Sequence, residues 1–275
     1  MHRRGRYHRP VQPQIRKNPS PNAVSVAACA VIPARFASTR FPGKPLARDT
    51  GKFLIQHVYE RAAEAGALDR VIVATDDERI VEAVRSFGGE AVMTRTDHVS
   101  GTDRVAEVAA GLDCDVVVNI QGDEPELEPA YVGRLVERLA RDRQCPMATL
   151  ACPFAAVASG DPADPSAVKV VVDTRGRAMY FSRSWIPCPA APSPPEADGA
   201  GGPPYLHLGI YAYRREFLMT LASLKPTPGE LIERLEQLRA LEYGYTIDVV
   251  TVEKAVVGID TPEDYAAFVR RYEAK

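Results

Sequence analysis

Three cationic side chains lie close together near the start of the chain. The segment from Pro33 to Pro45 contains Arg35, Arg40 and Lys44 beside hydroxyl residues and a glycine. Cations held near free backbone N–H groups attract polyanions, and loops at the carboxyl ends of parallel strands commonly bind phosphates. The segment has neither the Gly-x-Gly-x-x-Gly nor the Walker spacing. The residue types therefore indicate a polyphosphate cradle, with a solvated basic loop as the alternative.

A second motif places carboxylates directly after an apolar run. Residues 119–125 read NIQGDEP, so Asp123 and Glu124 follow a predicted strand. Mg²⁺ usually keeps several waters and is held by one or two carboxylates together with substrate phosphates. Asp123, at the sheet edge that carries the cations, would supply half of a magnesium site. Gly-Asp-Glu-Pro is also an ordinary turn sequence, and that interpretation requires no chemistry.

The second carboxylate of this site is assigned to Asp260. It stands in the sequence GIDTPED, where Thr261, Pro262 and Asp264 predict a helix N-cap with proline at the first helical position. Capping explains most of this motif without catalysis. Asp260 lies outside the cap, and an acid just before a helix can approach a metal bound at a sheet edge.

Polar residues in the second half of the chain suggest a sugar site. Arg183 follows one predicted strand, His207 lies in another, and Glu236 and Gln237 are neighbours in a predicted helix. Each has an ordinary interpretation as well. A strand histidine is commonly only hydrogen-bonded, and a Glu-Gln pair on a helix is usually solvated.

The elements that must position these residues alternate through the first half. Val- and Ile-rich runs predict strands, amphipathic patterns predict helices, and their alternation is typical of a parallel sheet covered by crossover helices. The polar stretch before the third helix offers Thr102 or Asp103 as its N-cap. The predicted strands are 24–32, 70–75, 90–94 and 115–120, and the predicted helices are 52–66, 77–89 and 102–112.

After about residue 145 strands follow one another through turns such as DTRGR, which predicts an inserted β-hairpin. The expected fold is a three-layer α/β/α sandwich with a mixed, mainly parallel sheet, in one domain over residues 27–275. Residues 1–26 are expected to be a disordered basic tail, and residues 188–204 a mobile proline-rich loop. Further predicted strands are 147–154, 167–173, 178–183, 206–214 and 246–253, with helices at 230–244 and 261–274.

Composition excludes several classes of protein. The chain has 275 residues, of which 45% are hydrophobic and 25% charged, which excludes disorder, collagen and coiled coil as overall classes. Six of the 34 Lys and Arg residues lie within residues 1–22, so the rest of the chain is acidic and argues against nucleic-acid binding. The five cysteines have no Cys-x-x-Cys spacing. The apolar run over residues 23–32, which follows the basic N-terminal segment, is too short to span a bilayer. We therefore expect a cytoplasmic protein with no membrane span.

The motifs together resemble one family, the 3-deoxy-manno-octulosonate cytidylyltransferases. The resemblance covers about residues 28–272 and depends most on the combination of AVIPARFASTRFPGKPLA with QGDEP and GIDTPEDY. It implies an enzyme that joins CTP to the eight-carbon sugar acid 3-deoxy-D-manno-octulosonate (Kdo), giving CMP-Kdo and pyrophosphate for lipopolysaccharide assembly. It also implies Mg²⁺ as cofactor and a homodimer with the inserted hairpin as its dimerisation region.

The resemblance assigns roles motif by motif, with Arg183 or His207 suited to the sugar's carboxylate and Arg35, Lys44, Asp123 and Asp260 forming the catalytic set. Other acid sugars, such as a sialic acid or an 8-amino relative of Kdo, and a non-catalytic nucleotide-binding regulator are the alternatives. The implied phosphate contacts are Arg35, Arg40 and Lys44; the cytosine and ribose contacts Ala74, Thr75, Asp76, His98, Ser100 and Thr102; the metal ligands Asp123 and Asp260; and the sugar contacts Gln121, Arg183, His207, Glu236 and Gln237.

Overall fold

The computed structural model describes residues 26–37, 40–154, 161–188, 204–255 and 258–274. Apart from their end residues, the predicted basic tail and the predicted proline-rich loop lie outside the described residues. Within the described ranges, no helix is both long enough and apolar enough to cross a membrane.

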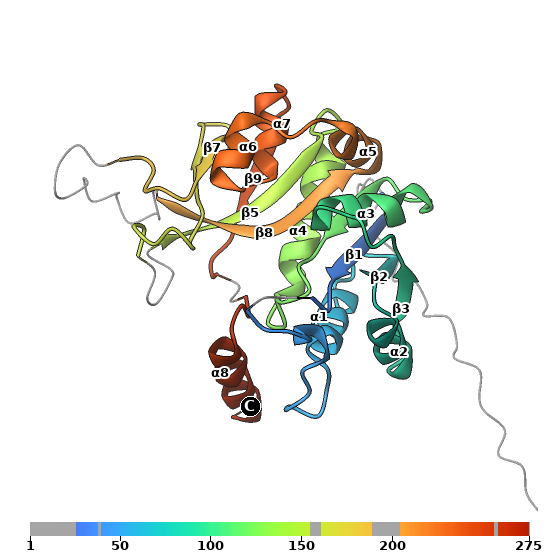
Figure 1. Ribbon diagram of the computed structural model, residues 1–275. Coiled ribbons are helices and arrows are strands. Elements are labelled where there is room, and N and C mark those ends of the chain that lie inside the picture. The colour runs from blue at the N-terminus through green and yellow to red at the C-terminus, as the bar shows by residue number, and fades with distance from the viewer. Residues whose placement is uncertain (1–25, 38–39, 155–160, 189–203, 256–257, 275) are drawn as a thin grey trace, which may run out of the picture.

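Among the described residues, a mixed nine-stranded sheet forms the centre of the structure (Figure 1). Its main path runs β3-β2-β1-β4-β8-β5-β9, and β8 is antiparallel to both of its neighbours on that path. The other neighbours on the path are parallel, which confirms the predicted mixed sheet. The strands are β1 Ala28–Ala34, β2 Arg70–Thr75, β3 Glu90–Met93, β4 Val116–Asn119, β5 Met147–Pro153, β6 Lys169–Val172, β7 Ala178–Ser182, β8 Tyr205–Arg214 and β9 Ile247–Thr251.

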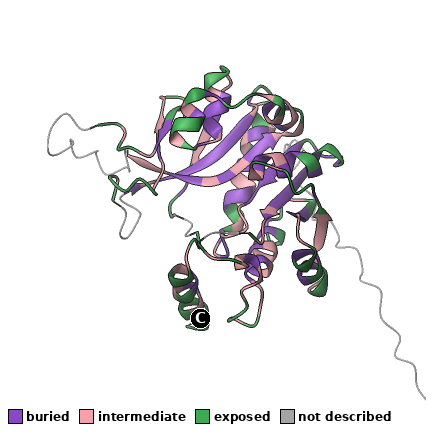
Figure 2. Ribbon diagram, viewed as in Figure 1, coloured by how far each residue is buried: buried purple, intermediate pink, exposed green. Residues whose placement is uncertain are grey.

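Helices cover both faces of this sheet, as the alternation in β1 shows. Ala30 and Ile32 belong to the apolar core that includes residues of α1 and α4, whereas Cys29 and Val31 belong to the core that includes residues of α3 and α5. Successive strand residues point to opposite faces, so both faces are buried (Figure 2). The helices are the 3-10 helix η1 Lys44–Leu46, α1 Leu54–Ala63, α2 Glu78–Ser86, α3 Gly101–Ala110, α4 Pro129–Arg141, α5 Arg215–Ser223, α6 Pro228–Glu233, α7 Gln237–Glu242 and α8 Pro262–Glu273.

The predicted inserted hairpin is present as β6 and β7. The two strands are antiparallel, with Lys169 opposite Ser182, and a turn with Gly176 at φ 79° joins them. β6 also pairs with β8, so the hairpin extends the half of the sheet that contains the reversed strand. Its role in dimerisation stays a prediction.

The prediction of one helix over residues 230–244 is wrong. The chain forms α6 and α7 instead, because Arg234 adopts the left-handed conformation at φ 54° and ends α6. An ion pair between Glu230 of α6 and Arg239 of α7 then holds the two short helices together at 2.5 Å. Two further helices, α4 and α5, have no counterpart among the predicted elements.

The last helix, α8, packs against α1 through a small separate core. Leu54 of α1 lies with Ile259, Tyr265 and Phe268 in this cluster. His57 adds an edge-on ring contact to Phe268, with 5.1 Å between ring centroids. The helix begins with the predicted cap, because Thr261 and Asp264 form a reciprocal capping box. This packing fixes the residues that precede α8 against the loop after β1 (Figure 1).

Gly122 is expected to be essential to this arrangement. A Cβ atom there would lie 2.9 Å from the main-chain oxygen of Pro33, so Gly122→Ala forces the ends of β1 and β4 apart. We expect the free energy of unfolding to fall by about 1–3 kcal/mol in urea denaturation. Gly66→Ala is the matched control, since its Cβ meets nothing within 4 Å, and it should change stability by less than about 0.5 kcal/mol. Equal effects of the two substitutions would remove the close approach as a constraint.

Candidate active site at the carboxyl edge of the sheet

The side chain of Lys44 joins two carboxylates that are far apart in the sequence. Its Nζ lies 2.7 Å from Oδ2 of Asp123 and 3.9 Å from Oδ1 of Asp260. The same ammonium donates to the main-chain oxygen of Ile259 at 2.7 Å. Only 14% of the Lys44 side chain is exposed, so much of this contact is shielded from water. The structure therefore brings together the two acids and the lysine that the sequence placed in one site.

Main-chain contacts hold the two acidic segments in register. The N–H of Ile259 donates to the main-chain oxygen of Asp123 at 2.9 Å. The N–H of Asp260 donates to the carboxylate of Asp264 in the helix cap at 3.1 Å. The capping and site interpretations of this motif are therefore compatible, because the cap leaves the Asp260 side chain directed toward Lys44.

The two arginines of the predicted cradle lie at the same edge. Arg40 is exposed and pairs with Asp260 at 3.1 Å. Arg35 follows β1 and donates to the main-chain oxygen of His98 at 2.9 Å. The cations thus reach from the α8 cap to the segment before α3, which is a span suited to an extended anionic chain.

Residues at the end of β2 are held by a buried arginine. Ala74 and Thr75 are fully buried, and Thr75 Oγ1 accepts a hydrogen bond from the N–H of Asp77. Asp76 pairs at 2.7 Å with Arg104, whose side chain is completely buried. The role of Arg104 was not predicted, since an arginine on a helix is usually solvated.

The polar segment before α3 is organised differently from the sequence prediction. Ser100, and neither Thr102 nor Asp103, is the N-cap, because its hydroxyl accepts from the N–H of Asp103 at 3.1 Å. His98 turns its ring toward Glu107 and forms a short hydrogen bond with that carboxylate. Thr102 is free to use its hydroxyl elsewhere, and it contacts Glu236 across the site.

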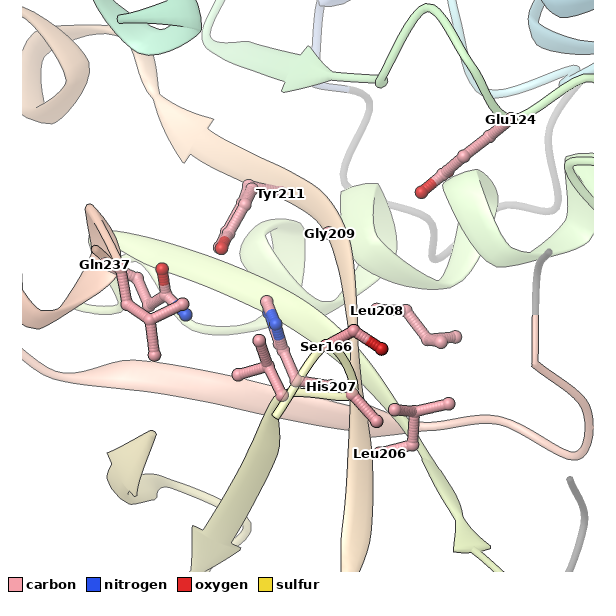
Figure 3. A pocket seen from close by; sticks show the side chains of 11 residues that line it. Glu124, Ser166, Leu206, His207, Leu208, Gly209, Tyr211 and Gln237 are labelled. Carbon is pink, nitrogen blue, oxygen red and sulfur yellow. The ribbon is translucent and has the colours of Figure 1, made fainter. Parts of the chain in front are cut away.

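Two adjoining cavities open beside the strand end that carries Asp123. The larger has a volume of about 330 Å³ and lies between β8, the segment before β6 and the start of α7 (Figure 3). The smaller, of about 220 Å³, reaches toward the start of α3. Gln121 and Glu236 line the smaller cavity, His207 lines the larger, and Gln237 lines both.

His207 is an uncharged member of the cavity wall. Burial lowers the pKa of His207 to about 3. Thr149 Oγ1 donates to the main-chain oxygen of Ile210 at 2.9 Å, so the 2.9 Å contact between Thr149 and His207 Nε2 is assigned as donation by the imidazole. The ring is therefore uncharged in the ligand-free protein, and its expected contact with the sugar carboxylate stays a prediction.

The side chain of Arg183 donates to main-chain oxygens near the hairpin, and its expected sugar contact stays a prediction. Its Nε donates to the main-chain oxygen of Glu233 at 2.8 Å, and its Nη1 donates to that of Pro165 at 3.0 Å. These contacts tie the end of the hairpin to α6, and Arg183 lines neither of the two cavities.

The Glu236-Gln237 pair is not a solvated helix face, which was the ordinary interpretation. Burial raises the pKa of Glu236, and hydrogen bonds with Thr102 and Ser100 oppose this shift. Gln237 is 5% exposed, and its Nε2 has no hydrogen-bond partner among the described residues. Gln121 donates through Nε2 to the main-chain oxygen of Gly209 at 3.3 Å, which orients its amide at the smaller cavity.

Sequence reasoning missed Tyr211, Tyr213 and Glu124 among the residues that line these cavities. Tyr211 and Tyr213 follow His207 and Gly209 at every second position of β8, so strand periodicity alone could have found them. Glu124 was passed over beside Asp123. Burial, and then the charge of Asp123, raise the pKa of Glu124 well above its usual range.

The two carboxylates that meet at Lys44 fit a magnesium ion that keeps water and phosphate ligands better than a metal site made of protein ligands alone. Two carboxylates, Asp123 and Asp260, converge on one cation at this edge. Within the described ranges no group of three or more His, Cys, Asp or Glu side chains is gathered for a metal. Mg²⁺ commonly takes one or two protein carboxylates and completes its shell with phosphates and water.

Acids and cations at the carboxyl edge of an α/β sandwich are typical of nucleotide-binding proteins, and the comparisons with known proteins narrow this class. Residues 29–249 match the family model described as cytidylyltransferase. The chain is 52% identical over 239 residues to the 3-deoxy-manno-octulosonate cytidylyltransferase of Syntrophotalea carbinolica, covering 86% of this chain and 94% of that protein. It is 54% identical over 244 residues to the protein of the same name from Syntrophobacter fumaroxidans, covering 87% and 94%. The chain therefore belongs to the 3-deoxy-manno-octulosonate cytidylyltransferase family.

A solved structure supports the same assignment. The structure of CMP:2-keto-3-deoxy-manno-octonic acid synthetase complexed with CTP superimposes with a TM-score of 0.81 at 44% identity. The match covers 90% of this chain and 99% of the other. The α/β fold predicted from the sequence is thus confirmed by comparison as well as by the strand order.

We expect the pH dependence of the free energy of unfolding to show that His207 is uncharged in the folded protein. The folded pKa lies below the ordinary value, so between pH 6.5 and pH 3 the unfolded chain binds a proton that the folded chain does not. This contribution to stability is complete above pH 6.5 and is lost as the pH falls toward 3. Urea titrations from pH 7.5 to 5 give the free energy of unfolding at each pH. Its decrease with falling pH should be less steep in His207→Gln than in the unsubstituted protein, by up to about 1.4 kcal/mol per pH unit. Parallel curves for the two proteins would contradict a neutral His207.

Proposed function

We propose that this chain transfers CMP from CTP to the anomeric 2-hydroxyl of Kdo, releasing pyrophosphate and supplying CMP-Kdo to lipopolysaccharide assembly. The observation that carries the proposal is the contact of Lys44 with both Asp123 and Asp260, at an edge that opens into two cavities. The relatives of about 50% identity carry this activity in their names.

The proposed nucleotide contacts follow from the charges. Arg35, Arg40 and Lys44 would hold the triphosphate, and Asp123 with Asp260 would hold Mg²⁺. When bound, the ion would neutralise charge on the phosphoryl oxygens. The walls for cytosine and ribose would come from the end of β2 and the segment before α3, at Ala74, Thr75, Asp76, His98, Ser100 and Thr102.

In the proposed reaction the sugar's 2-hydroxyl group releases its proton to solvent and its oxygen forms a bond to the α-phosphorus, while the bond from that phosphorus to the bridging oxygen of pyrophosphate breaks. The cations hold the leaving pyrophosphate in line, which is catalysis by position and charge. Gln121, Glu236 and Gln237 would orient the sugar, and His207 would shape its cavity as an uncharged group.

Two alternatives differ in their substrates. A cytidylyltransferase for a sialic acid or for 8-amino-Kdo would share the nucleotide half, and a non-catalytic regulator would bind CTP without turnover. Incubation with Mg²⁺, each nucleoside triphosphate and each sugar acid in turn, with pyrophosphate as the readout, separates these functions. We expect pyrophosphate release only when the nucleotide is CTP and the sugar acid is Kdo.

We further propose that the protein is a homodimer that works in the cytoplasm. Exposed apolar side chains gather near the hairpin, with Met179 on β7 63% exposed and Ile232 on α6 82% exposed. Such surfaces commonly mark contacts between subunits. Cys29 and Cys114 are buried thiols, which fits a reducing compartment. Light scattering that gave a mass near 30.0 kDa would contradict the dimer.

Substitution of the paired acids tests the metal site. Asp123→Asn and Asp260→Asn should each lower turnover by about 10²- to 10³-fold, because each removes a preorganised charge. Circular dichroism and the melting temperature should show that the fold is retained. Should Asp260→Asn only lower the melting temperature and leave turnover unchanged, its side chain would be structural and would not be a metal ligand.

Substitution of Lys44 tests the phosphate cradle. Lys44→Ala should weaken CTP binding by at least about 10-fold in calorimetric titration, since it removes a charge-assisted contact. Lys52→Ala is the matched control, because that ammonium pairs with Glu60 at 2.6 Å, outside the described site. A CTP affinity that responds equally to both substitutions would exclude a specific role for Lys44.

A further inference from the structure

Two consecutive acids leave the turn after β4 in different directions. Asp123 reaches Lys44, whereas Glu124 lines the larger cavity. Figure 3 shows the Glu124 side chain approaching the cavity from the side opposite to the β8 residues. One turn therefore directs the side chain of Asp123 toward Lys44 and that of Glu124 toward the larger cavity.

The carboxyl group of Glu124 lacks the partners that a structural acid would have. It is 7% exposed, and its Oε2 has no hydrogen-bond partner among the described residues. Glu230 is a useful contrast, because it is 6% exposed and receives 2.8 Å and 2.5 Å hydrogen bonds from Arg239. Buried polar atoms in folded proteins are nearly always paired, so an unpaired one needs an explanation.

A second unpaired polar atom lines the same cavity. Nε2 of Gln237, at the start of α7, is buried and has no partner in the part of the chain that the structure describes. The amide of Gln237 and the carboxyl of Glu124 come from separate elements (Figure 3). A ligand with several hydroxyl groups is the chemical class that satisfies both at once.

The cavity wall holds other groups besides these two. Leucine side chains supply apolar surface, and Ser166 and Tyr211 supply hydroxyl groups. His207 already uses its Nε2 on Thr149. Buried polar atoms without a partner discriminate between ligands, because a ligand that does not pair with them leaves them unsatisfied.

We propose that Glu124 is a specificity-determining residue, whose carboxyl group hydrogen-bonds a hydroxyl group of the sugar acid opposite Gln237. The proposal rests on the proposed function for the identity of the substrate. It adds a contact from the turn of the metal site to the sugar, so that one short segment touches both substrates.

The test compares two substitutions of Glu124. Glu124→Leu removes the hydrogen bond and should raise the KM for Kdo by about 10- to 100-fold, while the KM for CTP stays within about 2-fold. Glu124→Gln keeps a group that donates and accepts, and should restore most of the sugar affinity. The melting temperature of Glu124→Leu should stay equal or rise, because a buried atom without a partner has been removed.

Asp248→Leu is the control, since it removes a buried acid on β9 that pairs with Arg138 at 2.5 Å and lines neither cavity. It should lower the melting temperature and leave the KM for Kdo unchanged. A fall in melting temperature for Glu124→Leu with an unchanged KM for Kdo would overturn the proposal and make Glu124 structural. An equal rise in both KM values would overturn it too.

Failure of the proposed function would be seen separately. If the unsubstituted protein releases no pyrophosphate with Kdo, that function fails, and the comparison is then made on sugar binding alone. Saturation-transfer NMR with Kdo, without CTP, should show weaker contact in Glu124→Leu than in the unsubstituted protein. Unchanged contact in the variant, or none in either protein, would overturn the role of Glu124.

Discussion

A single ammonium group joins three parts of the chain that are remote in sequence. Lys44, in the loop after β1, contacts Asp123 after β4 and Asp260 before α8. Two carboxylates held this close would repel each other without a cation between them. The pairing of β1 with β4 brings the first two segments together, and the packing of α8 on α1 brings the third. The geometry of the edge therefore depends on this shared charge contact.

The strand β8, which is antiparallel to β4 and β5, divides the sheet into two halves that supply different parts of the site. On one side, β1 to β4 are parallel and deliver the cations and acids to one edge. On the other side, β8 supplies His207, Gly209 and Tyr211 to the larger cavity. Charged groups gather at the edge of the first half, and the larger cavity, lined by both polar and apolar side chains, lies beside the second. The two halves meet at the turn that contains Asp123 and Glu124.

Much of the first half could be predicted because its signals are local. β2 was predicted residue for residue, and the loop cations and Asp123 follow directly from strand ends. The division of α6 from α7 was not predictable from periodicity, because Leu231 continues the apolar pattern although it is 64% exposed. The roles of Arg183 and His207 depended on tertiary partners that no spacing encodes. Glu124 was overlooked because its direction is set by the turn rather than by its residue type.

The position of Asp260 late in the chain has a consequence for synthesis on the ribosome. Every strand of the sheet described here precedes residue 252, whereas α8 runs to Glu273. A nascent chain can thus assemble the sheet before its second carboxylate is anchored. A product cut short before α8 would retain most of its apolar cores and leave Lys44 with one acidic partner. Premature termination would then yield a chain that keeps its sheet but lacks the charge contact that closes this edge.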